Sequence, residues 1–277
     1  MSKVCTLKIE KKSKGYWIVK MTHEDKEKIR WIVKNLDPII KWKRERDIWR
    51  KMLQKNPDEL WVRYIIGQFC VTRGIRNWEN LKKCKDNWLT FHRKMRLGVL
   101  IEQSDVSNYI LGVFEEFKPT IYWKKIAKKI ANFVQKPNIV KNGKLILFDN
   151  LEGLNENQKR EKLLERTRGF FNMKSVSDLM IEVGMAKDLI AFDTRIVGFL
   201  VDYLLEPGTL SAKEDNGSKL IGKVQSSPML YKKMEQELRK VCKEIRIPLS
   251  KLDRIIFNSY DIPVIQYILE KDGYIKS

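Results

Sequence analysis

The chain of 277 residues is long enough to bury a substantial core, and its hydrophobic fraction of 43% argues against a disordered protein. Lys and Arg number 55 against 35 Asp and Glu, which gives a net charge of +20. Such an excess favours a polyanionic partner, above all nucleic acid, over an adaptation to heat or for solubility alone.

Neither membrane insertion, secretion nor metal binding is indicated by the sequence. No run approaches the ~18 apolar residues of a membrane span, and the N-terminal segment interleaves charged and apolar residues, unlike a signal peptide. The four Cys form no C-x-x-C pair, and the two His lie far apart. We therefore expect an intracellular monomer with no membrane partner, no metal and no cofactor.

The elements expected in chain order are one β-hairpin followed almost entirely by helices. Residues 3–21 alternate between polar and apolar in the manner of strands around the turn KKSKG, so we assign 1–21 to an N-terminal β-hairpin extension. From Thr22 the apolar residues recur at helical spacing. We expect a mainly α fold, a two-lobed helical bundle over 22–277, with helices starting near Thr22, Asp37, Asn56, Ser227 and Ser250 and covering 76–96, 105–117, 120–135 and 156–167. The last of these is expected to be capped by Asn155.

Two of the predicted helices differ in the residues on their faces, and a predicted loop follows the second of them. The helix opened by Asn56-Pro57 is apolar on most faces and reads as a central, buried helix ending at Gly74. The helix over 120–135 has one apolar face and one face of lysines, which we interpret as solvated surface rather than as a DNA site. The segment 136–143 reads as a loop.

The stretch 166–205, within which a helix, a tight hairpin and a second helix follow one another, carries the strongest functional signal. A helix-hairpin-helix over about 156–184 would hold phosphates through the backbone N–H groups of its turn and the N-terminus of its second helix. We expect the second helix to stop at Gly184, because glycine favours a helix C-cap. Gly169 and Asn172 are residue types that tolerate the positive φ such a turn needs. The residues expected to contact DNA here are Arg166, Arg168, Gly169, Asn172 and Ser175.

Lys174 and Asp193 could supply the chemistry next to that hairpin. Lys174 lies in the first turn of the second helix, where the helix dipole and partial burial favour a neutral, nucleophilic amine. Asp193 precedes the helix TRIVGFLVDYLL, so we expect it to be an ionised N-cap that stabilises positive charge on a sugar. The alternative is a surface lysine and an ordinary capping aspartate, because Lys is abundant throughout the chain.

The order NMKSVSDLMIEVG, then LIAFDTRIVGFL, resembles the helix-hairpin-helix DNA glycosylase superfamily, most closely its archaeal-type 8-oxoguanine DNA glycosylase/AP lyases. The resemblance implies that Lys174 is the Schiff-base lysine and Asp193 the catalytic aspartate. The block PLSKLDRIIFNS resembles the family's late helix and implies that Asp253 and Phe257 line the pocket for a flipped base. The block LWVRYIIGQFCVTRG resembles the early helix that fills the gap in the duplex, which implies a role for Arg73 or Gln68.

The chain departs from the family pattern at several positions. Phe170 and Asn172 stand where hairpin glycines are common, Arg195 where His is common, and Phe257 where Trp is common. The Cys cluster that holds an iron–sulfur centre in the endonuclease III branch is absent.

Three functions follow as hypotheses. The first is a bifunctional glycosylase/AP lyase that removes 8-oxoguanine from double-stranded DNA through a lysine imine. The second is a monofunctional glycosylase of the same fold, in which Asp193 acts without an imine. The third is a non-enzymatic nucleic-acid-binding protein that uses the hairpin only to hold phosphates.

Overall fold

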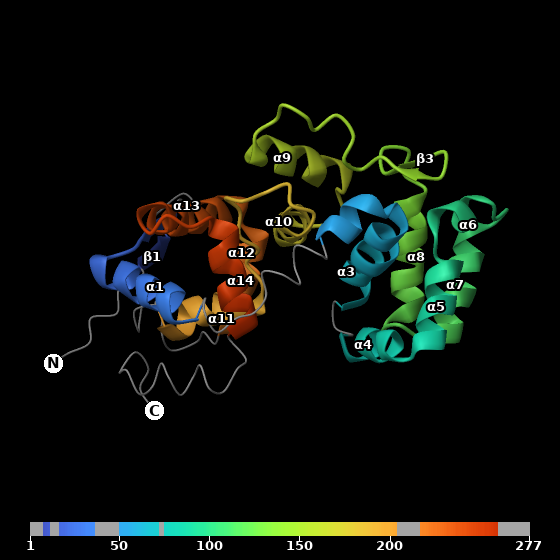
Figure 1. The fold of residues 1–277 in the computed structure, drawn as a ribbon, viewed down its shortest axis with the longest axis horizontal. Helices are drawn as coiled ribbons and strands as arrows, with labels where there is room; N and C mark the ends of the chain where they lie inside the picture. The colour runs from blue at the N-terminus through green and yellow to red at the C-terminus, as the bar shows by residue number, and fades with distance from the viewer. Residues whose placement is uncertain (1–7, 12–16, 37–49, 72–74, 204–216, 260–277) are drawn as a thin grey trace. The chain divides into compact units, whose positions relative to one another are not determined.

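The computed structural model describes residues 8–11, 17–36, 50–71, 75–203 and 217–259. The chain forms two compact units: unit 1 comprises Met1–Arg46 and Met173–Ser277, and unit 2 comprises Asp47–Asn172. Helices make up most of the described residues of both units (Figure 1), which confirms the mainly α fold. No helix in the described ranges is long and apolar enough to cross a membrane.

Unit 1 begins with the predicted β-hairpin. Strands β1 (Lys8–Lys11) and β2 (Trp17–Lys20) pair antiparallel, with Lys8 opposite Lys20. The hairpin packs through β2 on helix α13 (Pro228–Glu244). Helix α1 (His23–Leu36) follows, and its start is fixed because Asp25 accepts a hydrogen bond of 2.8 Å from the backbone N–H of Thr22.

The rest of unit 1 is a helical cluster. It consists of α10 (Met173–Glu182), α11 (Thr194–Tyr203), α12 (Gly217–Ser226), α13 and α14 (Leu249–Ser259), and α11 packs against both α12 and α14. The expected stop at Gly184 is confirmed, because this glycine has φ +77° and the N–H of Met185 bonds to the carbonyl of Met180. Ser227 caps α13 as expected.

Unit 2 is built from short helices around a buried one. Helical residues 50–55 are followed by the π-helix η1 (Glu59–Ile66), α3 (Gly67–Val71), α4 (Ile75–Lys83), α5 (Lys85–Lys94), α6 (Leu97–Ile101), α7 (Val106–Phe117), α8 (Trp123–Val134) and α9 (Glu156–Arg166). Asn155 caps the start of α9 as predicted, and the structure adds a capping box in which Gln158 takes part.

The core of unit 2 confirms the prediction of a central buried helix opened by Asn56. The Asn56 side chain accepts from the backbone N–H of Asp58 at 3.1 Å, and the indole of Trp61, fully buried, donates to the Met95 carbonyl at 2.8 Å. Phe69 and Phe133 contact one another edge to face. The predicted end of this helix, Gly74, lies outside the described residues.

Two local predictions for unit 2 were wrong. The expected helix over 76–96 is divided into α4 and α5, because Cys84 adopts an extended backbone between them. The expected loop over 136–143 contains strand β3 (Val140–Lys141), which pairs with β4 (Lys144–Leu145). Asn142 and Gly143 both have positive φ, as a two-residue hairpin turn requires, and Asn-Gly is the commonest sequence there.

The helix-hairpin-helix motif itself stays a prediction. Its first helix, α9, and the hairpin belong to unit 2, whereas its second helix, α10, belongs to unit 1. The catalytic pair that the sequence suggests, in contrast, lies within unit 1 alone.

Candidate active site

Lys174 lies in the first turn of α10, as expected, and its side chain is largely buried at 22% exposure. One turn along the same helix, the Asp178 carboxylate lies 3.8 Å from the Lys174 Nζ. Glu182 follows after one further turn. Residues spaced by four lie on one face of a helix, so α10 presents a lysine and two carboxylates in a row.

Asp193 caps α11, because its Oδ1 accepts a hydrogen bond of 2.9 Å from the backbone N–H of Ile196. Burial raises the pKa of Asp193, and this effect outweighs the lowering by the Ile196 N–H and by the charge of Lys174. The charge of Asp178 raises it further. Lys174 therefore lies within electrostatic range of two carboxylates, one on its own helix and one at the start of the next.

The sequence reasoning expected the cap to keep Asp193 ionised, without considering burial. The side chain is half-buried beside Asp178, and both effects favour the protonated acid. The carboxylic acid of Asp193 is therefore weaker than that of an aspartate at an exposed N-cap.

Arg254, on α14, organises the carboxylates of this site. Its Nη2 lies 2.8 Å from Asp178 Oδ1 and 2.5 Å from Glu182 Oε1, while its Nε lies 3.5 Å from Asp253 Oδ2. Burial alone would lower the pKa of Arg254, but the three carboxylates raise it. The guanidinium thus joins α10 to α14 and orients the carboxylate that faces Lys174.

The loop that leads to Asp193 is held by buried side chains from α13. The Tyr231 hydroxyl donates to the Ile190 carbonyl at 2.6 Å and accepts from the Phe192 N–H at 3.3 Å. Glu235 accepts from the Ile190 N–H at 3.3 Å. Backbone N–H and C=O groups that are buried away from water need hydrogen-bond partners. These hydrogen bonds therefore allow the loop to be buried, and they also fix its position.

Two further elements complete this support. Gln225, on α12, donates to the Phe192 carbonyl at 2.9 Å, and Arg239, on α13, donates to the Asp188 carbonyl at 2.8 Å. Asp253, on α14, accepts from the Ala191 N–H at 2.7 Å. Asp193 therefore stands at the end of a segment fixed by three helices, a preorganised position for a catalytic carboxylate.

Asp253 and Phe257 lie in this cluster. Asp253 is 1% exposed and is therefore buried. Burial raises the pKa of Asp253 to about 7, against lowering by Arg254 and by the Ala191 N–H. The ring of Phe257 lies 4.4 Å from the Arg195 guanidinium and 5.6 Å from that of Arg254. The contacts of Asp253 are to the protein itself, and its role in a base pocket stays a prediction.

The residues expected to contact DNA at the hairpin differ in backbone conformation and in exposure. Gly169 has φ +84°, as expected, but the expectation for Asn172 was wrong, because Asn172 is not among the described residues with positive φ. Arg168 is exposed, whereas Arg166 donates to the Leu147 carbonyl at 2.6 Å and so supports the fold of unit 2. Ser175 is half-buried beside Lys174. Arg73 lies outside the described residues.

Residues preceding the hairpin hold its backbone, which the sequence reasoning did not foresee. Lys136 donates to the Arg168 carbonyl at 3.1 Å and lies 4.6 Å from the centre of the Phe170 ring. Asn138 donates to the Arg166 carbonyl at 3.4 Å. The lysine thus supplies a positive charge directly to a carbonyl of the turn.

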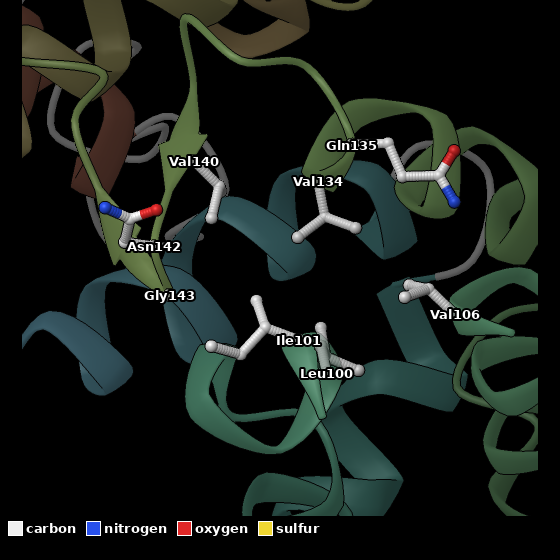
Figure 2. Close-up of a pocket in the computed structure, with 8 residues that line it drawn as sticks. All are labelled: Leu100, Ile101, Val106, Val134, Gln135, Val140, Asn142 and Gly143. Carbon is white, nitrogen blue, oxygen red and sulfur yellow. The ribbon is translucent and has the colours of Figure 1, made fainter. Parts of the chain in front are cut away.

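Two further features bear on ligands. In the described part of the chain, no group of three or more His, Cys, Asp or Glu is arranged to hold a metal ion. A cavity of about 270 Å³ lies in unit 2, whereas Lys174 and Asp193 belong to unit 1. Figure 2 shows its mostly aliphatic lining with two amide side chains, formed by Leu100, Ile101, Val106, Val134, Gln135, Val140, Asn142 and Gly143.

Comparisons with known proteins add no relative: the chain matches no protein-family model, no curated protein and no solved structure. The resemblance to the glycosylases therefore stays a prediction that depends on the motif residues alone.

The sequence reasoning missed Asp178, Arg254 and Tyr231. A signal was present for Asp178, because its spacing of four from Lys174 puts the two side chains on one helix face. No local pattern marks Arg254 or Tyr231, which act through contacts far along the chain.

Proposed function

We propose that this protein is a base-excision DNA glycosylase with AP lyase activity, which removes oxidised guanine from duplex DNA. The observation that carries the proposal is Lys174 in the first turn of α10, within the field of two carboxylates, one of which ends a segment held by three helices. The net charge of +20 supports a nucleic-acid substrate.

The chemistry assigns one step to each group. The damaged base leaves the stack so that its sugar can be reached. The neutral amine of Lys174, after loss of a proton, attacks C1′, and the C1′–N bond breaks with its electron pair leaving on the base, which is then protonated. Asp193 in its ionised form stabilises the positive charge that develops on the sugar. The amine now bonded to C1′ loses a proton to solvent as the C1′–O4′ bond breaks, with its electron pair on O4′, which takes up a proton, and this opening of the sugar ring gives the imine. The imine permits loss of a 2′ proton, after which the C3′–O bond breaks with its electron pair on the 3′ phosphate and the strand is nicked.

Borohydride trapping tests the proposal on two duplexes, one with 8-oxoguanine and one with a preformed abasic site. The parent should form a covalent adduct with both, and Lys174→Gln with neither. Asp193→Asn should slow base release by about 10² while still trapping the abasic duplex, since no base has to leave there. Lys240→Gln, an exposed lysine of the same unit, is the matched control and should behave as the parent.

The same assay separates the rival functions and checks the electrostatics. Base release without a covalent adduct would identify a monofunctional glycosylase. If the protein neither released a base from nor formed an adduct with duplexes that contain 8-oxoguanine, uracil, hypoxanthine or 3-methyladenine, the proposed enzyme activity would be contradicted. Because the Asp193 pKa is raised and the ionised form is needed, base release should decline as the pH falls, starting at a higher pH than for an exposed aspartate.

A further inference from the structure

Helix α8 carries four lysines, Lys124, Lys125, Lys128 and Lys129, which we call the α8 lysine face. The first three are exposed and Lys129 is half-buried. The helix contains no acidic residue. Its opposite face packs against α3 and α7 (Figure 1) through residues that are all buried, namely Ala127, Ile130, Ala131, Phe133 and Val134.

The charges of the α8 lysine face are not compensated within the described part of the chain, where no carboxylate lies within 4 Å of any of its four amines. Other lysines of the same unit are paired: Lys82 Nζ lies 2.8 Å from Glu79, and Lys94 Nζ lies 2.5 Å from Glu116.

The spacing of the four lysines adds a cost. Lys124 and Lys128, and likewise Lys125 and Lys129, are like charges one turn apart, an arrangement that destabilises a helix. A stretch that is unfavourable for the isolated helix becomes favourable when an external anion binds to it. Two of the amines lie over aromatic rings, Lys124 over Trp123 at 5.2 Å and Lys129 over Phe69 at 5.9 Å, but no carboxylate of the described residues offsets the repulsion among the four charges.

The positive charge extends past the ends of α8. Lys118, exposed, precedes the helix, and Lys136, just after it, donates to the Arg168 carbonyl of the hairpin. Lys124 and Lys128, and likewise Lys125 and Lys129, are one helical turn of about 5.4 Å apart, so their flexible side chains can reach successive phosphates of one strand. The α8 lysine face and the hairpin thus belong to the same unit and are connected by Lys136.

We propose that the α8 lysine face, which the sequence alone led us to interpret as solvated surface, binds the phosphate backbone of duplex nucleic acid, without regard to sequence or damage. A membrane surface fits less well, because the apolar face of α8 is buried in the core; the exposed apolar residues next to α8 along the chain are Ile121 and Tyr122, 60% and 46% exposed. The binding goes beyond the proposed activity and holds even if Lys174 performs no chemistry.

The test is affinity for an undamaged duplex, measured by fluorescence anisotropy over a series of salt concentrations. The variant Lys124→Gln/Lys125→Gln/Lys128→Gln should bind about 10-fold or more weakly at low salt. The slope of log affinity against log salt should become shallower by about 2 to 3, since each phosphate contact contributes about 0.9.

The matched control is Lys82→Gln/Lys94→Gln/Lys240→Gln, which removes the same net charge from lysines that already have carboxylate partners. It should retain the parent's slope. If the two triple variants lose affinity and slope equally, only net charge matters and the proposal is overturned.

Two further measurements keep the result interpretable. Lys128→Gln alone should reduce the slope by about 1, and both this variant and the triple variant should melt at or above the parent temperature. Loss of binding to phosphatidylserine vesicles with unchanged duplex binding would overturn the proposal in favour of a membrane. Imine trapping of an abasic duplex at low salt and saturating protein should persist in the triple variant, which separates this surface from the proposed activity.

Discussion

The polar cluster around Arg254 in unit 1 and the α8 lysine face in unit 2 differ in how their positive charges are balanced. Around Arg254, a buried guanidinium lies within 3.5 Å of three carboxylates, so the cluster is compensated internally. On α8, four amines have no carboxylate within 4 Å in the described residues.

The difference teaches where each region finds its counter-charge. A buried charge without a partner costs several kcal/mol, so the Arg254 cluster must be complete within the protein. An exposed lysine is hydrated, so leaving it without a carboxylate partner lowers the stability of the protein little. The α8 lysine face therefore needs no counter-charge from the protein itself. The first arrangement fixes the geometry of Lys174 and Asp193, and the second, as we propose, contributes affinity for nucleic acid without fixing any geometry.

The largest expected effect comes from removing the central cation of the compensated cluster. Arg254→Met leaves Asp178, Glu182 and Asp253 without their shared partner and should destabilise the protein by about 3–5 kcal/mol in urea denaturation. Lys240→Met, which breaks an exposed pair with Glu237, is the control and should cost about 0–1 kcal/mol. A loss below about 1 kcal/mol for Arg254→Met would mean that the cluster is hydrated rather than buried.

A smaller effect should follow pH through Asp253. Its folded pKa of about 7 exceeds the ordinary value of 3.8, so between these pH values the folded protein holds a proton that the unfolded chain has released. This group's contribution to stability therefore falls as the pH rises from about 4 to about 7, by at most about 1.4 kcal/mol per pH unit.

Asp253→Asn removes the titration while an amide oxygen can still accept from Ala191. The free energy of unfolding should therefore drop less between pH 5 and pH 7 for the variant than for the parent. Urea denaturation at both pH values measures the difference, and an identical pH dependence would contradict the assignment.

The smallest effect should come from the uncompensated face. Lys128→Glu replaces a like-charge pair with an opposite-charge pair to Lys124, so it should stabilise the protein by roughly 0.5 kcal/mol at low salt and by less at high salt. Duplex affinity should fall at the same time. Destabilisation by more than about 1 kcal/mol would show that Lys128 serves the fold itself, since exposed pairs contribute less than that.

The sequence determined the features that depend on neighbours along the chain. Each of these features depends on residues within a few positions of one another, so the sequence predicted it. They are the helical periodicity, the caps at Asn155 and Ser227, the stop at Gly184 and the buried helix after Asn56. The Asn142-Gly143 turn was equally local, and its signal was overlooked.

The tertiary structure alone decided what surrounds Lys174 and Asp193. Arg254 contacts Asp178 across 76 positions of the chain, and Tyr231 contacts Ile190 across 41. Such pairings follow from how the helices pack. If the same side chains stood at other positions of those helices, the sequence would predict the same helices, so the sequence alone does not reveal the pairings. The sequence could therefore propose a nucleophile and its carboxylate, but the burial that raises the Asp193 pKa and the bonds that fix its loop exist only once α11, α12, α13 and α14 are assembled.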